Sequence, residues 1–308
     1  MRKMSETVLL IMAVGCLLSG CAKTGNTQSK SEVVDTKTNQ IDDRIIEETE
    51  PSKEKTEPKT LHFVDAFGQS YQTTINDRIE KHSYKDSSFQ RDGQMLSYED
   101  DVYTSRLGID VSHHQGEIDW QQVKEYGITF AFIRIGYRGY GESGSLNLDQ
   151  RVFDNIKGAQ AAGLDVGVYF FSQAINEDEA IEEAQTVIDA LNGYMLTLPV
   201  VYDPESILDD EARTDDVTGA QFTKNTVAFC ETIKAAGYEP MIYSNMLWEA
   251  FELDMEQLSA YEIWYADYEM LPQTPYHFLF WQYTNEAQVP GIEGEVDLNI
   301  QMMKKTSE

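Results

Sequence analysis

Cysteine and basic side chains are both scarce in this sequence. Its 308 residues contain only three cysteines, Cys16, Cys21 and Cys230. Lys and Arg together number 24 against 53 Asp and Glu, which gives a formal net charge of −29. This charge argues against nucleic acid as a partner, because phosphates attract side chains of the opposite sign. A neutral sugar polymer remains compatible with so acidic a chain.

Histidine is scarce as well, and this argues against a metal hydrolase. Of the five histidines, His62 and His82 precede the regular part of the chain. His113 and His114 are adjacent, so an extended backbone would turn them to opposite faces. His277 is expected to begin a strand, at the end opposite to the C-terminal strand ends where a barrel carries its site. We therefore expect no catalytic metal, and the absence of a G-x-S-x-G motif disfavours a serine nucleophile.

The apolar run VLLIMAVGCLLSG, residues 8–20, is too short to be a comfortable membrane span. It follows Arg2 and Lys3, which is the order found in a secretory signal peptide. The run ends in Leu-Ser-Gly before Cys21, and this resembles the lipobox of bacterial lipoproteins. The pattern predicts cleavage before Cys21, lipid on its sulfur, and attachment to the extracytoplasmic face of the bacterial cell membrane. An ordinary signal peptide with a chance cysteine is the alternative.

Composition divides the chain into four parts. Residues 1–20 are the lipoprotein signal peptide, and residues 21–60 are polar and acidic, as expected of a disordered tether. Residues 61–105 are interpreted as a partly structured linker, with a small hairpin that turns near Phe67-Gly68. Residues 106–303 form the regular part. Cys230 falls in this part without a partner, so no disulfide is expected in the mature chain.

Eight β-rich runs follow one another in the regular part, and helical patterns separate the earlier ones. This alternation predicts parallel strands with right-handed crossovers. Eight strands favour an α/β fold, a modified TIM-like (β/α) barrel whose last crossovers are degenerate. An open doubly wound sheet is the alternative, weakened by the lack of a G-x-G-x-x-G motif after the first run. The runs are 107–112, 130–136, 166–171, 198–205, 241–245, 262–268, 277–284 and 296–300, and the helical patterns are 118–127, 150–163, 177–193, 218–237 and 247–258.

Four carboxylates are expected at one mouth of this barrel, where the C-terminal strand ends carry active sites. Asp110 lies late in the first run, Asp203 and Glu205 close the fourth, and Asp297 lies in the eighth. Because residues two apart on a strand share a face, Asp203 and Glu205 should both face the lumen. Two such close carboxylates raise one pKa, which suits the acid and the stabilising partner of glycoside hydrolysis. Taken alone, D-x-E also fits a polar turn.

Aromatic residues strengthen the carbohydrate reading, because their faces stack on the CH faces of sugar rings. Tyr169 and Tyr243 both lie late in a strand, and Trp281 belongs to an aromatic cluster in the last third of the chain. Arg134 also ends a barrel strand. Buried there it would need a carboxylate partner, and we expect one of the strand-end acids to provide it.

Taken in order, these motifs resemble glycoside hydrolase family 25, the N-acetylmuramidase lysozymes. The resemblance covers about residues 106–302 and rests on the ordered set and not on any single motif. One departure is Pro204, which stands in the middle of D-x-E where an aliphatic or aromatic residue is expected. The motifs are Gly108-Ile109-Asp110-Val111-Ser112 with His114 and Gly116, Phe132-Ile133-Arg134, Gly167-Val168-Tyr169-Phe170, Pro199 to Glu205, Tyr243-Ser244, Trp264 to Tyr268, Trp281-Gln282-Tyr283 and Val296-Asp297-Leu298-Asn299.

The resemblance implies a barrel that cleaves the β-1,4 bond between N-acetylmuramic acid and N-acetylglucosamine in peptidoglycan glycan strands, without a cofactor. It assigns Glu205 as proton donor and Asp203 as the group that assists the substrate acetamido group. It places Asp110 and Asp297 beside them, and Arg134, Tyr169, Tyr243 and Trp281 in the substrate subsites. Two alternatives stay open: a non-catalytic peptidoglycan-binding lipoprotein on the same barrel, and a metal-dependent deacetylase acting on the same polymer.

Overall fold

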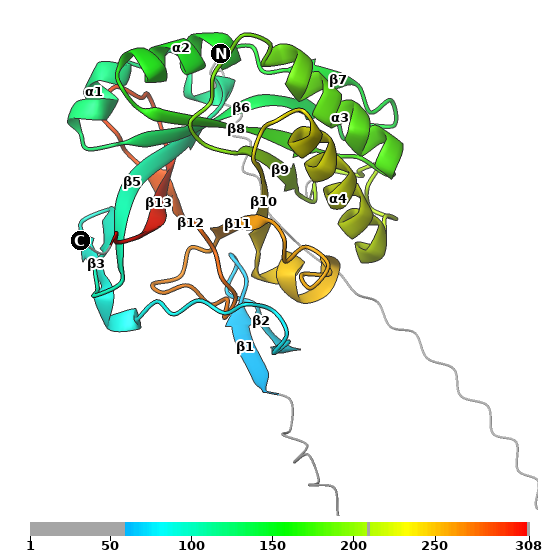
Figure 1. The fold of residues 1–308 in the computed structure, drawn as a ribbon, viewed down its shortest axis with the longest axis horizontal. Coiled ribbons are helices and arrows are strands. Elements are labelled where there is room, and N and C mark those ends of the chain that lie inside the picture. Colours follow the sequence, from blue (N-terminus) through cyan, green and yellow to red (C-terminus); the bar gives the residue numbers. More distant parts are fainter. Residues whose placement is uncertain (1–58, 208–209, 307–308) are drawn as a thin grey trace, which may run out of the picture. The chain divides into compact units, whose positions relative to one another are not determined.

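The computed structural model describes residues 59–207 and 210–306, so the signal peptide, Cys21 and nearly all of the tether lie outside the described residues. The described part is built around a closed barrel of eight strands (Figure 1). Each of the eight predicted runs forms one strand, and the predicted modified β/α barrel is confirmed. In order around the barrel, the strands are β5 (Tyr103–Val111), β6 (Phe130–Arg138), β8 (Asp165–Ser172), β9 (Val200–Pro204), β10 (Pro240–Asn245), β11 (Glu262–Ala266), β12 (Phe280–Ala287) and β13 (Val296–Lys304).

Four helices cover the outside of the first five barrel strands (Figure 1), as the helical patterns predict. Three of them begin at a residue whose side chain accepts backbone N–H groups of the first turn: Asp119, Asn176 and Thr218. Such caps satisfy donors that have no partner inside the helix. The helices are α1 (Trp120–Glu125), α2 (Val152–Ala161), α3 (Glu177–Ala190) and α4 (Gly219–Ala235).

The fifth predicted helix, over residues 247–258, does not form. A five-residue π-helical turn, η3 (Trp248–Glu252), stands there and is followed by irregular turns. Asp254 explains the interruption, because its backbone N donates to Thr223 Oγ1 of α4 at 2.9 Å and its carboxylate accepts the backbone N–H of Glu256. A short polar side chain that bonds to its own backbone competes with a helix in this way.

The last strand runs in the opposite direction from the others. The first seven barrel strands pair in parallel, whereas β13 is antiparallel to both β12 and β5. Asp297 therefore lies near the start of its strand, directly opposite Asp110 in the register. The expectation that Asp297 marks a C-terminal strand end is wrong, although the reversed strand still brings it to the same mouth.

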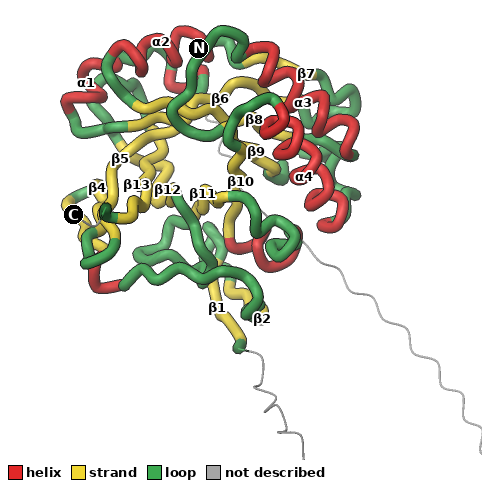
Figure 2. The backbone as a smooth tube through the Cα atoms, viewed as in Figure 1, coloured by secondary structure: helices red, strands yellow, loops and turns green. Residues whose placement is uncertain are grey.

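Residues 59–102 cover the outside of the barrel where helices are missing. They form two antiparallel hairpins, and Figure 2 shows loops and strands in this region in place of long helices. The turn predicted near Phe67-Gly68 is present, with Gly68 at a φ of 76°. Tyr84 anchors the connecting segment by donating its hydroxyl to the Phe278 carbonyl at 2.8 Å. The hairpins are β1 (Thr60–Val64) with β2 (Ser70–Thr74), and β3 (Phe89–Asp92) with β4 (Met95–Tyr98).

Bulky side chains fill the lower part of the barrel. Phe132 stacks on Trp264 with ring centroids 4.6 Å apart, and Phe130 packs edge-on against Phe280 at 5.2 Å. Gly108 leaves the space for one of these rings, because a Cβ at that position would lie 2.3 Å from the Phe130 ring. Polar side chains of the lumen therefore lie at the mouth of the barrel, where the parallel strands end. Within the described ranges, no helix is both long and apolar enough to cross a membrane.

Candidate active site

The mouth of the barrel holds a cluster of four carboxyl groups. Asp110 lies near the end of β5, Asp203 near the end of β9, and Asp297 near the start of β13. Glu205 follows β9 directly and is partly exposed, whereas Asp110 and Asp203 are buried. The structure thus brings all four sequence-predicted acids to one end of the lumen.

Burial and mutual repulsion hold protons on this cluster. Burial raises the pKa of Glu205 to about 7, and the negative charge of Asp110 adds to the rise. Burial likewise raises the pKa of Asp203 well above its usual value, with further contributions from Glu205 and Asp110. A carboxyl group with a pKa near 7 is protonated often enough at neutral pH to donate a proton to a leaving group.

Asp110 is buried, and its carboxylate accepts two side-chain hydrogen bonds. Its Oδ2 accepts from Gln282 Nε2 at 2.9 Å and from Asn299 Nδ2 at 2.8 Å. Burial raises the pKa of Asp110, and these two bonds oppose that rise. A side-chain hydrogen bond between Asp110 and Asp297 also lowers the pKa of Asp110 and raises that of Asp297. This hydrogen bond therefore favours the ionised form of Asp110 and the protonated form of Asp297.

Asp203 has an unused acceptor. Its Oδ1 is buried and has no hydrogen-bond partner among the described residues. Most buried polar atoms in folded proteins are paired, so an orphaned carboxylate oxygen in a site needs a donor from elsewhere. Pro204, the next residue, is buried and ends β9 opposite Ser172, and its side chain points away from the face that Asp203 shares with the lumen.

Tyrosines surround the acids from neighbouring strands. Tyr243 packs edge-on against Trp264 at 5.0 Å, and Tyr169 does so at 6.0 Å. Tyr243 donates its hydroxyl to Gln282 Oε1 at 2.9 Å, and Tyr268 donates to the same oxygen at 3.0 Å. Tyr169 and Tyr243 thus lie where the sequence expected them, beside the carboxyl cluster.

Gln282 and Asn299 are site residues that the sequence reasoning missed as such. Gln282 accepts the hydroxyls of Tyr243 and Tyr268 and donates to Asp110. Asn299 also donates to Asp110, and it accepts the Trp264 indole N–H at 2.7 Å. A usable signal was present in the alternation of β12, where Phe280 faces the lumen and Gln282 must follow on the same face.

Trp281 does not belong to the site. It lies on the outer side of β12, fully buried, with its ring edge-on to Phe89 of β3 at 5.4 Å. Its indole N–H donates to the Asp267 carbonyl at 2.7 Å. The assignment of Trp281 to a substrate subsite is therefore corrected: a neighbour of the lumen-facing Gln282 must point outward.

Arg134 reaches the rim of the mouth but pairs with an acid that the sequence reasoning did not consider. Its partner is Asp149, which follows the short strand β7 (Leu146–Leu148); the Arg134 Nη2 to Asp149 Oδ2 distance is 2.9 Å. His113 joins this pair, with its Nδ1 3.0 Å from the same carboxylate oxygen. The expectation of a strand-end acid as partner is wrong, because a loop returning to β6 supplies a closer carboxylate.

No metal site is formed by the residues that the structure describes. Within residues 59–207 and 210–306, no group of three or more His, Cys, Asp or Glu side chains has an arrangement that could hold an ion. The chemistry that this mouth can perform with its own groups is proton transfer and the stabilisation of positive charge by carboxylates.

Comparison with known proteins places the chain beside enzymes of one family. The sequence model described as glycosyl hydrolases family 25 matches residues 109–292. The autolytic lysozyme of Clostridium acetobutylicum is 24% identical over 193 residues, which cover 62% of this chain and 54% of the relative. Lysozyme M1 of Streptomyces globisporus is 27% identical over 213 residues, which cover 62% of this chain and 66% of the relative. The chain thus spans about half to two thirds of the length of these relatives.

A solved structure agrees in fold. The spore cortex lytic enzyme SleM of Clostridium perfringens matches with a TM-score of 0.56 at 21% identity, covering 64% of this chain and 67% of that one. At this identity the likeness shows the fold alone. The matched region begins within β5, so residues 59–102 lie outside the family match.

Proposed function

Because this chain belongs to glycosyl hydrolases family 25, we propose that it is a peptidoglycan hydrolase that cleaves the β-1,4 bond between N-acetylmuramic acid and N-acetylglucosamine. The observation that carries the proposal is the cluster of Asp110, Asp203, Glu205 and Asp297 at one barrel mouth. Relatives of this chain are named as lysozymes, which supports the same class of substrate.

Glu205 acts as the general acid in this proposal. It is the cluster member that combines partial exposure with a pKa raised to about 7, so it meets the substrate in its protonated form. It gives its proton to the glycosidic oxygen as the bond to the anomeric carbon breaks. The charge of Asp110 favours the protonated form before the reaction.

Asp203 assists the substrate acetamido group. Its unpaired Oδ1 accepts the acetamido N–H and orients the carbonyl oxygen towards the anomeric carbon. As that oxygen attacks, positive charge develops on the acetamido nitrogen, and the adjacent carboxylate stabilises it. Water then opens the cyclic intermediate, and Glu205, now ionised, takes the proton of that water. This route retains the anomeric configuration.

The remaining polar groups position the acids and the substrate. Asp297 supplies a proton to the bond with Asp110, so that two facing acids carry one charge between them. Gln282 fixes Asp110 from the other side. Arg134 and Tyr169 flank the mouth and are proposed to contact the sugar hydroxyl and acetamido groups.

The decisive experiment is digestion of purified peptidoglycan followed by borohydride reduction of the products. The proposal expects new muramitol ends with the wild-type protein and none above background with Glu205→Gln. The matched control is Glu239→Gln, an exposed glutamate just before β10 at the opposite end of the barrel. Binding of peptidoglycan without release of reducing ends by the wild type would contradict the proposal and favour a non-catalytic wall-binding protein. Activity that survives a chelator would exclude the metal-dependent deacetylase alternative, which would release acetate and create no reducing ends.

We further propose that the mature chain is anchored by lipid at Cys21 to the extracytoplasmic face of the bacterial membrane. The support is the apolar run of residues 8–20 and the lipobox-like Leu-Ser-Gly-Cys that ends it. Metabolic labelling with a fatty acid should mark the wild type and not Cys21→Ala, and the wild type should partition into a detergent phase. Equal labelling of both proteins would contradict the anchor.

A further inference from the structure

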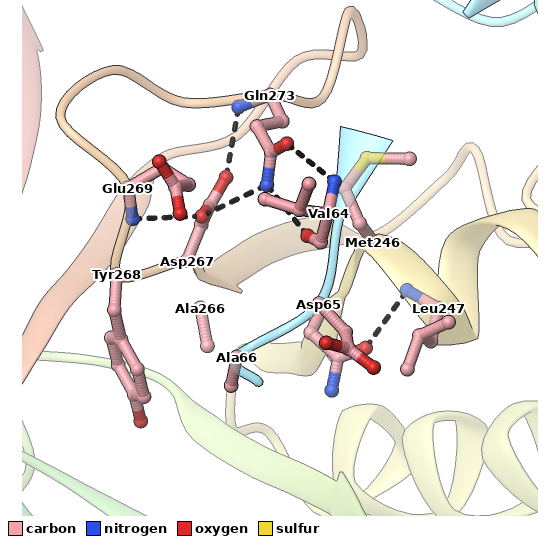
Figure 3. A pocket seen from close by; sticks show the side chains of 11 residues that line it. Val64, Asp65, Ala66, Met246, Leu247, Ala266, Asp267, Tyr268, Glu269 and Gln273 are labelled. Carbon is pink, nitrogen blue, oxygen red and sulfur yellow. Dashed lines mark hydrogen bonds between the residues drawn. The ribbon is translucent and has the colours of Figure 1, made fainter. Parts of the chain in front are cut away.

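A cavity lies between hairpin β1–β2 and the carboxyl ends of β10 and β11. Its volume is about 170 Å³, far above the roughly 10–15 Å³ that one water molecule needs. Figure 3 shows side chains reaching it from three segments that are distant in the sequence. These are Val64 and Ala66 at the end of β1, Met246 and Leu247 after β10, and Tyr268 and Glu269 after β11.

The cavity continues the substrate surface of the barrel mouth. Ala266, which lines it, lies two residues beyond Trp264 on the lumen-facing side of β11. Tyr268 forms one wall, and its hydroxyl donates to Gln282, the residue that holds Asp110. One tyrosine therefore borders both the carboxyl cluster and the cavity, so a polymer lying across the mouth would reach the cavity next.

The lining offers a ligand few but specific hydrogen-bond acceptors. Three carboxylates line the cavity, and two of them are used within the protein. Asp65 accepts backbone N–H groups of its own turn, and Asp267 accepts the Tyr265 hydroxyl at 2.7 Å and the Gln273 backbone N–H at 2.9 Å. Glu269 is exposed, and its carboxylate has no hydrogen-bond or ion-pair partner within the described part of the chain. The surrounding side chains Val64, Ala66, Met246 and Ala266 are apolar.

We propose that this cavity binds an additional N-acetylhexosamine unit of the glycan strand, outside the two sugars joined by the cleaved bond. The inference rests on the proposed function. Such a sugar carries apolar CH faces and an acetamido methyl group for the apolar lining, and hydroxyl and amide donors for Glu269. Tyr268, which is 40% exposed, gives it an aromatic face. Because Val64 and Ala66 precede the family match, this subsite belongs to the hairpin and not to the shared barrel.

The test compares peptide-free glycan strands of increasing length, prepared from peptidoglycan by amidase digestion. With the wild type, kcat/KM should rise when the strand becomes long enough to fill the cavity. Ala66→Trp fills the space and should remove this gain, by about tenfold on the long strands, which corresponds to about 1.4 kcal/mol of binding. Glu269→Ala, a milder change at an exposed position, should remove about fivefold, as expected for one lost hydrogen bond.

The matched control is Gln72→Trp, an exposed position on β2 outside the cavity, which should keep the wild-type dependence on length. Thermal unfolding of each variant checks that the hairpin remains folded. An unchanged ratio of long-strand to short-strand rates in Ala66→Trp and Glu269→Ala would overturn the subsite while leaving the hydrolase intact. The same assay is run in parallel on strands that keep their peptides. A loss confined to those strands would also overturn the sugar subsite, since it would assign the cavity to the peptide stem. Failure of the wild type to cleave any strand would instead refute the proposed function.

Discussion

At the scale of single residues, burial raises the pKa of Glu205, and the charge on Asp110 reinforces this effect. Asp110 lies on β5 and Glu205 directly follows β9, three strands further around the barrel, yet the negative charge of Asp110 contributes to the raised pKa of Glu205. The amide donors of Gln282 and Asn299 keep that charge in place by stabilising ionised Asp110. The pKa of the proposed general acid thus depends in part on Asp110, whose ionised form is stabilised by hydrogen bonds from two uncharged amide side chains.

The pH dependence of hydrolysis should report this tuning. The raised pKa of Glu205, about 7 in the free protein, keeps the acid protonated below that pH, so kcat/KM should fall as the pH rises through about 7. Asp110→Asn removes the neighbouring charge, and the alkaline limb of the profile should then move to lower pH. Measurement of kcat/KM against pH for the wild type and Asp110→Asn decides the point. An alkaline limb that stays in place in Asp110→Asn would exclude the coupling.

The Arg134 site makes a second residue-scale prediction, this time about stability. Asp149→Ala leaves the largely buried Arg134 without its carboxylate, and the free energy of unfolding should fall by about 3 kcal/mol. The double variant Arg134→Met/Asp149→Ala should lose less, because it buries no unpaired charge. Urea unfolding of the wild type, these two variants and Arg134→Met closes the double-mutant cycle. A loss in the double variant equal to the sum of the losses in Asp149→Ala and Arg134→Met would show that the pair contributes no coupling.

At the scale of elements, the strands could be predicted where β-rich runs and helical patterns alternate regularly along the sequence. The order of the eight strands and the placement of the four acids could be read from the sequence, because hydrophobic runs and helical patterns alternate so regularly. The reversed direction of β13 could not be predicted from the sequence. A short connection without a helix looks the same in sequence whether it joins two antiparallel strands or replaces a degenerate crossover between parallel ones. Trp281 was assigned to the wrong face of β12 for a different reason. Which of two adjacent residues faces the lumen depends on the register of the strand, and a shift of one residue exchanges the faces.

The glycines of the barrel strands give an element-scale prediction. Gly108→Ala would place a Cβ 2.3 Å from the Phe130 ring, and the ring is confined by Phe132 and Phe280, so the cost should be about 1–3 kcal/mol of unfolding free energy. Gly141→Ala is the control, because a Cβ there would meet no atom within 4 Å. Chemical denaturation measures both. A loss for Gly108→Ala no larger than that of the control would mean that the barrel base repacks freely.

At the scale of the whole described part, residues 59–102 are a cover and not a spacer. The sequence identified the first hairpin, but the packing of these residues on the barrel could not be anticipated, because their partners lie some 200 positions away. Phe89 and Tyr84 contact residues of the last barrel strands and the approach to them, Trp281 and Phe278. Without this cover, the outward aromatic residues of β12 would face water.

Tyr84→Ala tests the cover. Tyr84 is buried, packs edge-on against Phe278 at 5.0 Å and bonds to its carbonyl, so its loss should cost about 3–5 kcal/mol of stability. Phe67→Ala, which changes a ring that is 48% exposed at the hairpin turn, should cost far less. Thermal and urea unfolding provide the measurement. Similar small losses in the two variants would show that the segment packs only loosely on the barrel.

The long reach of this cover has a consequence for how the chain folds. Val64 bonds to Gln273 across 209 positions, and Tyr84 bonds to Phe278 across 194. Pairings of such high contact order form slowly, and an emerging chain exposes its early hairpins until nearly all of the barrel has been synthesised. A polypeptide of this kind gains little native structure before its C-terminal strands are available. Under the proposed export to the extracytoplasmic face, this late folding would keep the chain an unfolded thread while it crosses the membrane.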